Sequence, residues 1–262
     1  MAVPTTPVLM NLRQSSLVLA VTFALLPTPG VQAAKDSPAD SAPNFRVNLP
    51  DSYKSEINQN FSAAKGGRPA STTISGIWHS PKGGSKTDQP WSITVIKGED
   101  PEVTQAYNAR NAATMNIAKD DFGGANPYLY AGFERLTLPW GKAIAYFVQA
   151  SKDGKWREPN NEQLRYQIRG VTDDKKYTII GRFQVRLAQL PADSKKAQDA
   201  GGDLKRLHAF ESYKLLNQED PNNFEPSLTE MQNLVGSVRV SPEKEETPES
   251  KPKPKPTPTP GT

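Results

Sequence analysis

The chain has 262 residues and a formal net charge of +4 at pH 7, from 32 Lys and Arg against 28 Asp and Glu, and it contains no cysteine. Without cysteine there is no disulfide, thiol nucleophile, zinc–thiolate site or cysteine-linked lipid anchor. The positive balance is weak and no long basic block occurs within the domain, which argues against nucleic acid as a partner.

The N-terminal region has the pattern of a secretory signal peptide. The apolar run Leu17–Leu26 follows the positive charge of Arg13 and precedes helix-breaking Pro and Gly residues. The run is shorter than the roughly 20 apolar residues that span a bilayer, which argues against a transmembrane anchor. Val31 and Ala33 are small residues at the two positions that a signal peptidase inspects. We therefore expect a signal peptide over residues 1–33 and a mature protein that is periplasmic or extracellular.

Composition divides the rest of the chain into three segments. Residues 34–43 form a polar, Pro-containing lead that we expect to be disordered. Residues 44–240 are long enough for one α+β domain that folds without disulfides. Residues 241–262 form a disordered tail rich in Pro and Lys, because alternating prolines favour polyproline II over a packed core. The tail is either a spacer that reaches the cell wall or a passive solubilising end.

The start of the domain predicts a strand and then a short helix. Apolar and polar residues alternate over residues 44–50, which is typical of a half-buried strand. An Asp–Ser pair then caps a helix with Tyr53, Ile57 and Phe61 on one face, and two glycines end it.

One helix and two pairs of strands follow. Asp100 is a good N-cap and the proline after it suits a first helical turn, so a helix is expected to begin there. The strands are bounded by turn residues. The five elements are expected at residues 74–78, 91–96, 100–117, 129–138 and 142–150.

The clearest pattern is a long antiparallel hairpin over residues 164–187. Apolar residues alternate with mostly polar ones on both sides of a turn at residues 172–175, which predicts one buried face and one solvent-exposed face. Gly181 lies inside the second strand, where a bulge or a close backbone contact is expected.

Two helices, at residues 203–217 and 227–238, close the domain. The second begins with a capping box, in which the side chains of Ser227 and Glu230 each accept a hydrogen bond from the other's backbone N–H. Strands and helices do not alternate as they do around a parallel sheet. We therefore expect an α+β fold, with a mainly antiparallel sheet of six to seven strands flanked by helices.

Two stretches and the order of elements carry a family resemblance. They are an opening Phe-Arg-Val-Asn-Leu-Pro strand from Phe45, a central helix after a Trp-led strand, a Tyr-rich hairpin, and a closing Leu-Val-x-Ser-Val-Arg-Val stretch from Leu234. Over about residues 45–240 the chain resembles the PsbP-like superfamily. This superfamily includes the photosystem II extrinsic protein PsbP and the yeast Ran-binding Mog protein. The resemblance implies an α/β/α sandwich that serves as a non-catalytic accessory or interaction module. It carries over no active-site residue.

The sequence shows no strong catalytic or metal-binding motif. His79 fits a surface residue at a strand end, His208 fits a structural residue on a helix, and no Gly-x-Ser-x-Gly elbow occurs. The acidic pairs Asp120–Asp121 and Asp173–Asp174 lack the ligand spacing of a calcium loop, and the second pair suits a hairpin turn. We therefore expect no catalytic residues, no metal and no cofactor.

The residue that best fits a partner-binding role is Trp156. Its indole lies between the cations of Lys155 and Arg157 in an expected loop, and interface hot spots and sugar-stacking platforms use exposed Trp and Arg. The alternative is that Trp156 folds back over the sheet edge. The solvent-exposed face of the hairpin adds four arginines that would attract an acidic partner, or else are scattered solvated charges. These are Arg165, Arg169, Arg182 and Arg186.

The sequence thus favours an exported, non-catalytic accessory or binding module that contacts a protein or cell-envelope partner. Two alternatives stay open. One is an exported hydrolase of glycan or peptide with paired carboxylates as acid and base. The other is a small-molecule carrier with an apolar pocket inside the sandwich. The sequence indicates neither the identity of the partner nor the oligomeric state.

Overall fold

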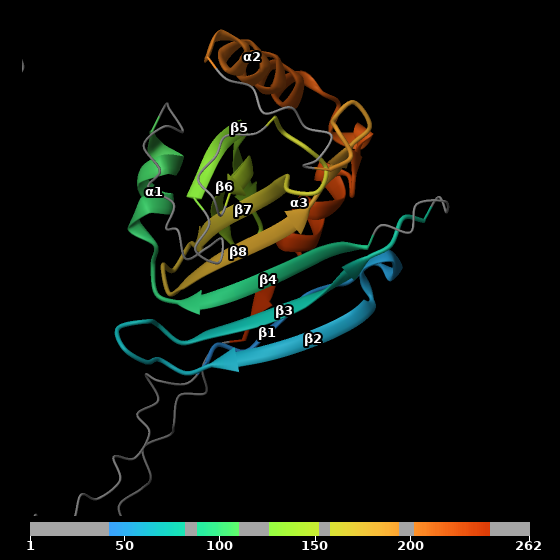
Figure 1. Cartoon of the computed structure of the whole chain (residues 1–262). Helices are drawn as coiled ribbons and strands as arrows, with labels where there is room; N and C mark the ends of the chain where they lie inside the picture. The colour runs from blue at the N-terminus through green and yellow to red at the C-terminus, as the bar shows by residue number, and fades with distance from the viewer. Residues whose placement is uncertain (1–41, 82–87, 110–125, 152–157, 194–201, 242–262) are drawn as a thin grey trace, which may run out of the picture. The chain divides into compact units, whose positions relative to one another are not determined.

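A computed structural model of the chain describes residues 42–81, 88–109, 126–151, 158–193 and 202–241. Its main element is a seven-stranded sheet in the order β2-β3-β4-β8-β7-β6-β5 (Figure 1). All six pairings are antiparallel. The strands are β2 (Ser55–Ser62), β3 (Ser71–Trp78), β4 (Gln89–Lys97), β5 (Asn126–Leu138), β6 (Gly141–Ser151), β7 (Arg165–Thr172) and β8 (Tyr177–Gln184).

Helices and short strands complete the described part of the fold. The helices are α1 (Pro101–Asn108), α2 (Gly202–Gln218) and α3 (Leu228–Gly236), with single 3-10 turns at η2 (Asp51–Tyr53) and η5 (Pro221–Asn223). Two-residue strands pair as β1 (Phe45–Arg46) with β11 (Arg239–Val240) and as β9 (Arg186–Leu187) with β10 (Phe224–Glu225). The expected α+β class, with a mainly antiparallel sheet and flanking helices, is confirmed.

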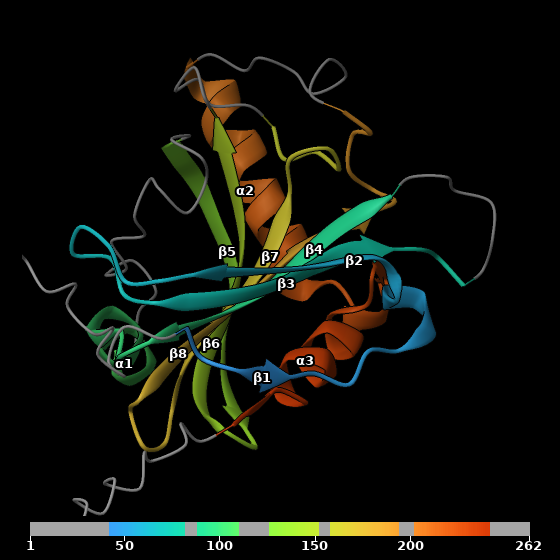
Figure 2. The same cartoon turned by 90° about the horizontal axis from the view of Figure 1, so that it is seen from below.

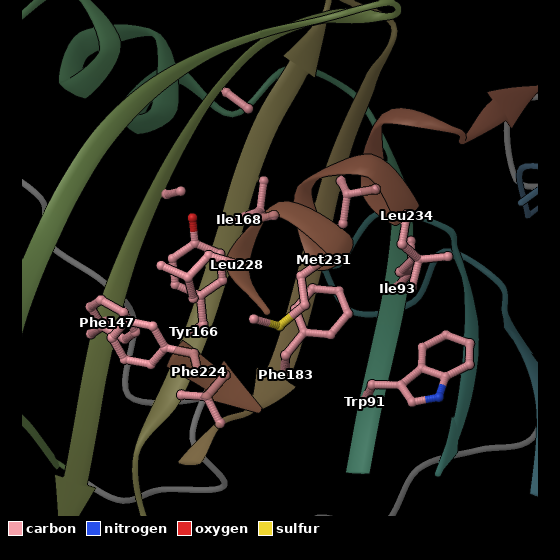
Figure 3. Close-up of a cluster of buried hydrophobic side chains, with 14 of the residues drawn as sticks. Trp91, Ile93, Phe147, Tyr166, Ile168, Phe183, Phe224, Leu228, Met231 and Leu234 are labelled. Carbon is pink, nitrogen blue, oxygen red and sulfur yellow. The ribbon is translucent and has the colours of Figure 1, made fainter. Parts of the chain in front are cut away.

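The larger core lies between the sheet and α3 (Figure 3). The strand register places four aromatic residues in one row across the sheet, namely Trp91, Phe183, Tyr166 and Phe147. The buried side chains that α3 adds are Leu228, Met231, Leu234 and Val235. Phe224 stacks on Phe147 with the ring centroids 4.9 Å apart. The buried face predicted for the hairpin is therefore confirmed.

A second core lies on the opposite face of the sheet, against α1. Successive residues of a strand point to opposite faces, and the neighbours of Phe147 in β6 are the buried Tyr146 and Val148. These two side chains belong to a cluster with Val103 and Ala106 of α1. The sheet therefore has a helix packed on each face.

The prediction of a solvent-exposed face for the β7–β8 hairpin is wrong. On the α1 side of these strands Gln167 and Thr178 are buried, and the arginines among them are half-buried. Alternation of residue types separates polar from apolar side chains. It does not show that a helix from another part of the chain packs on the polar side.

The prediction of a short helix after residue 50 is also wrong. Only the η2 turn is helical, and β2 follows at Ser55 and pairs with β3. Ser and Asn, which make up half of β2, compete with helix formation through their side chains. Tyr53 is buried, but Ile57 and Phe61 are exposed at the sheet edge and do not form a buried helix face.

The contacts of α3 agree in part with the predictions made from the sequence. A Cβ on Gly181 would lie 2.6 Å from Val235 Cγ2, so the close contact predicted at this glycine is confirmed. Glu230 N donates to the N-cap Ser227 Oγ at 3.1 Å, as expected. The second half of the capping box differs, because Glu230 Oε1 accepts from Ser52 Oγ at 2.9 Å. This bond ties α3 to the η2 turn.

Several predicted segments are shorter than expected or lie outside the described residues. The opening strand is limited to β1, and α1 starts after the predicted N-cap Asp100 and ends at Asn108. The predicted signal peptide, most of the lead and nearly all of the tail lie outside the described residues. Within the described ranges no helix is both long enough and apolar enough to cross a bilayer.

Candidate functional site

The four candidate arginines lie on or beside the α1 side of the sheet and are all half-buried. Arg165 and Arg169 belong to β7, Arg182 to β8 and Arg186 to β9. Arg182 stands opposite the buried Gln167 in the strand register. The structure thus brings three of the four arginines onto one face, but a helix also packs there.

Arg169 forms an internal ion pair with Asp100. The Arg169 Nη2 atom lies 2.5 Å from Asp100 Oδ2, and the two side chains are only 12% and 13% exposed. The other carboxylate oxygen, Asp100 Oδ1, accepts from Glu102 N at 3.0 Å and caps α1. Asp100 therefore joins the first turn of α1 to β7, and Arg169 has a structural role.

Arg165 is also engaged within the domain. Its Nη1 atom donates to the backbone carbonyls of Glu162 and Leu164 at 3.1 and 3.2 Å. Burial lowers the pKa of the Arg165 guanidinium. This arginine holds the segment before β7.

Trp156 and its neighbours Lys155 and Arg157 lie outside the described residues. What the structure describes is the segment that follows them. Buried Gln149 accepts from Asn160 N at 3.1 Å, and its Nε2 donates to the Tyr128 hydroxyl at 2.5 Å. The chain after Trp156 is therefore anchored to β5 and β6.

Of the residues tested for catalytic or metal chemistry, Asp120, Asp121 and the side chain of His208 lie outside the described part of the structure, and His79 and Asp174 have ordinary surroundings. His79 Nδ1 lies 3.5 Å from Asp88 Oδ1 on the exposed surface. Asp174 Oδ1 accepts from Thr172 Oγ1 at 2.6 Å and from Lys176 N at 3.1 Å, which is hairpin-turn bonding as predicted. The hydrogen bond from Thr172 lowers the pKa of Asp174. In the described part of the chain, no three His, Cys, Asp or Glu side chains gather as metal ligands would.

An open interaction surface in the described structure is the edge strand β2. It is the terminal strand of the sheet, so its outer side has no strand partner among the described residues. Ile57 is 42% exposed and Phe61 65% exposed. Figure 1 shows β2 away from all three helices, and Figure 2 shows the β2–β3 hairpin crossing in front of the other strands.

The pairing of β2 with β3 is unbroken from Asn58 to Ser62. The register shifts between Ser55 and Asn58, where Glu56 has a positive φ of 51°. A bulge of this kind ends the regular edge at its N-terminal side. Ile57 lies at the end of this shift, four residues before Phe61, and the two side chains share one face of the sheet, because residues two or four apart in a strand point the same way.

The opposite edge of the sheet is interrupted. Strand β5 has two register shifts in its pairing with β6. Gly132 N donates to Asn217 Oδ1 of α2 at 2.6 Å, and α2 packs against β5. Bulges and covering helices are the usual protection of sheet edges, and β5 has both. The β2 edge has only the bulge at Glu56.

Strand β2 has the chemistry for strand addition. Its outer backbone N–H and C=O groups are positioned to pair with an extended segment, and its exposed apolar side chains supply contact area. Sequence reasoning missed this surface because Tyr53, Ile57 and Phe61 also fit a helical period. The signal that favours a strand here is the Ser and Asn content of the stretch, because these side chains compete with helix formation.

Comparison with protein-family models, curated proteins and solved structures gives no match for the chain. The PsbP-like resemblance therefore stays a prediction.

Proposed function

We propose that the protein is an exported, non-catalytic binding module that accepts an extended protein strand at the β2 edge. The observation that carries the proposal is the free edge of β2 with Ile57 and Phe61 exposed beside it. Backbone hydrogen bonds along such an edge supply affinity, and alternate side chains supply selectivity. Export is supported by the signal-peptide pattern of residues 1–33.

The composition of β2 supports this proposal. Its sequence Ser-Glu-Ile-Asn-Gln-Asn-Phe-Ser contains one charge, no Lys and no Pro, although Lys and Pro are residues that block edge pairing. About two thirds of the Phe61 side chain is available to a partner. Covering it contributes about 1–2 kcal/mol, or roughly tenfold in affinity.

The test is site-specific photocrosslinking in cells that produce the protein. A benzoylphenylalanine at position 61 is expected to give a discrete adduct, because Phe61 lies at the strand-accepting edge. The matched control is position 210 on α2, since Phe210 is 68% exposed and Figure 1 shows α2 far from β2. Adding Ile57→Lys is expected to abolish the adduct from position 61. Equal adducts from both positions, or none from position 61, would refute the proposal.

A further inference from the structure

The segment Ile57–Phe61 of β2 is complementary to itself when two copies run antiparallel. A two-fold axis through Gln59 places Ile57 of each copy opposite Phe61 of the other. Directly opposed aromatic and β-branched side chains stabilise antiparallel strands. The pairing uses the same surface on both copies, so it closes as a dimer.

Charge favours the antiparallel direction. The N-terminal side of β2 has the exposed acids Asp51 and Glu56 with one base, Lys54, whereas the turn after β2 has the exposed bases Lys65 and Arg68. Antiparallel pairing places the more acidic end of each strand beside the basic end of its partner. Parallel pairing would place like charges together, which is destabilising.

We propose that the occupant of the β2 edge is a second copy of this chain, paired antiparallel about Gln59. This inference rests on the proposed function, because it requires β2 to accept a strand, and it goes further by naming that strand. The pairing joins two seven-stranded sheets into one continuous sheet and covers Ile57 and Phe61 on both copies. The other edge of the seven-stranded sheet is not free in the same way, because α2 and two bulges interrupt β5.

The register is tested by single cysteines, since the chain has none of its own. In the Gln59→Cys variant, the two Cβ atoms at the axis would lie about 4.5–5.5 Å apart, close to disulfide distance. The matched control Ser62→Cys is on the same strand and exposed. Its two sulfurs would lie about 20 Å apart, at about 3.4 Å per residue from the axis. Mild oxidation is expected to link Gln59→Cys into a dimer at least tenfold faster than Ser62→Cys.

Sedimentation equilibrium of the purified protein tests the dimer without crosslinks. The wild-type chain is expected to show a concentration-dependent dimer, and Phe61→Lys is expected to weaken it by more than about tenfold, because both copies lose an apolar contact. Phe210→Lys is the matched control and is expected to leave the dimer unchanged. A wild-type chain that stays monomeric, with equal oxidation of Gln59→Cys and Ser62→Cys, would overturn the inference.

A labelled peptide of residues 54–63 separates this inference from the proposed function. If the chain is monomeric but binds the peptide, and Phe61→Lys abolishes that binding, β2 accepts strands and the second copy is not its occupant. The inference then fails while the proposed function stands. If the chain neither dimerises nor binds the peptide, both fail. A dimer that the peptide competes with, measured by fluorescence anisotropy and sedimentation, supports both.

Discussion

The ion pair between Asp100 and Arg169 is expected to hold α1 against the sheet. The change that isolates its charge is Asp100→Asn, because Asn is as good an N-cap as Asp and keeps an acceptor for Glu102 N. The complementary change, Arg169→Met, keeps the length of the side chain and removes the cation. The two changes and their combination form a double-mutant cycle.

The magnitude follows from distance and burial. The pair is 2.5 Å apart with about seven eighths of each side chain buried. At an effective dielectric of about 20, charges about 4 Å apart attract by about 4 kcal/mol, and desolvation of the two groups offsets part of this. We therefore expect Asp100→Asn to lower the free energy of unfolding by about 2–3 kcal/mol. The coupling energy from the cycle should be of similar size.

The assay is urea unfolding followed by tryptophan fluorescence. The exposed pair of Lys54 with Asp51, 2.7 Å apart, serves as the control and is expected to show no measurable coupling, because solvent screens it. A coupling energy below about 0.5 kcal/mol for Asp100 and Arg169 would refute the reasoning. In that case the packing of Val103 and Ala106 alone would hold α1.

Three further changes test other parts of the fold by the same assay. Gly181→Ala is expected to cost about 1–3 kcal/mol, because its Cβ would overlap Val235, and an unchanged midpoint would contradict the close contact. Tyr53→Phe is expected to leave stability unchanged or raise it by up to about 1 kcal/mol, since the buried hydroxyl has no hydrogen-bond partner among the described residues; a clear loss would show a missing partner. The lowered pKa of Asp174 stabilises the fold above the pKa of the unfolded chain, and this contribution is lost as pH falls through the folded value. Wild type should therefore lose more stability than Asp174→Asn between pH 5 and pH 2, and parallel curves would contradict the role of the Thr172 bond.

The local sequence pattern predicted those features correctly that depend on residues close together in the chain. The turn at Asp174 and the N-cap at Ser227 were predicted because each depends on residues within three positions in the sequence. The row of Phe183, Tyr166 and Phe147 follows from the period of two in their strands. Short-range chemistry and alternation therefore account for the hairpin, for α3 and for the core between them.

Long-range packing explains why the solvent exposure of the candidate arginines was predicted wrongly. Arg169 alternates with apolar neighbours as a solvent-exposed residue would, but Asp100 and α1, from an earlier part of the chain, pack over it. No local feature of β7 encodes that contact. Gln167 is buried for the same reason, since a sheet with helices on both faces leaves few strand positions exposed.

Packing of the core does not require the apolar side chains that β2 exposes. The buried aromatic row and α3 complete the larger core without Ile57 or Phe61, and Tyr53 is the only apolar side chain of the predicted helix face that is buried. If β2 served only as the last strand of the sheet, we would expect Lys or Pro in it, because these residues block edge pairing and cost little stability at exposed positions. Strand β2 instead places two large apolar side chains beside an outer backbone edge that pairs with no other described strand, with opposite charges at its two ends. That combination increases the tendency to associate and adds little to folding, which supports the proposed binding role of β2.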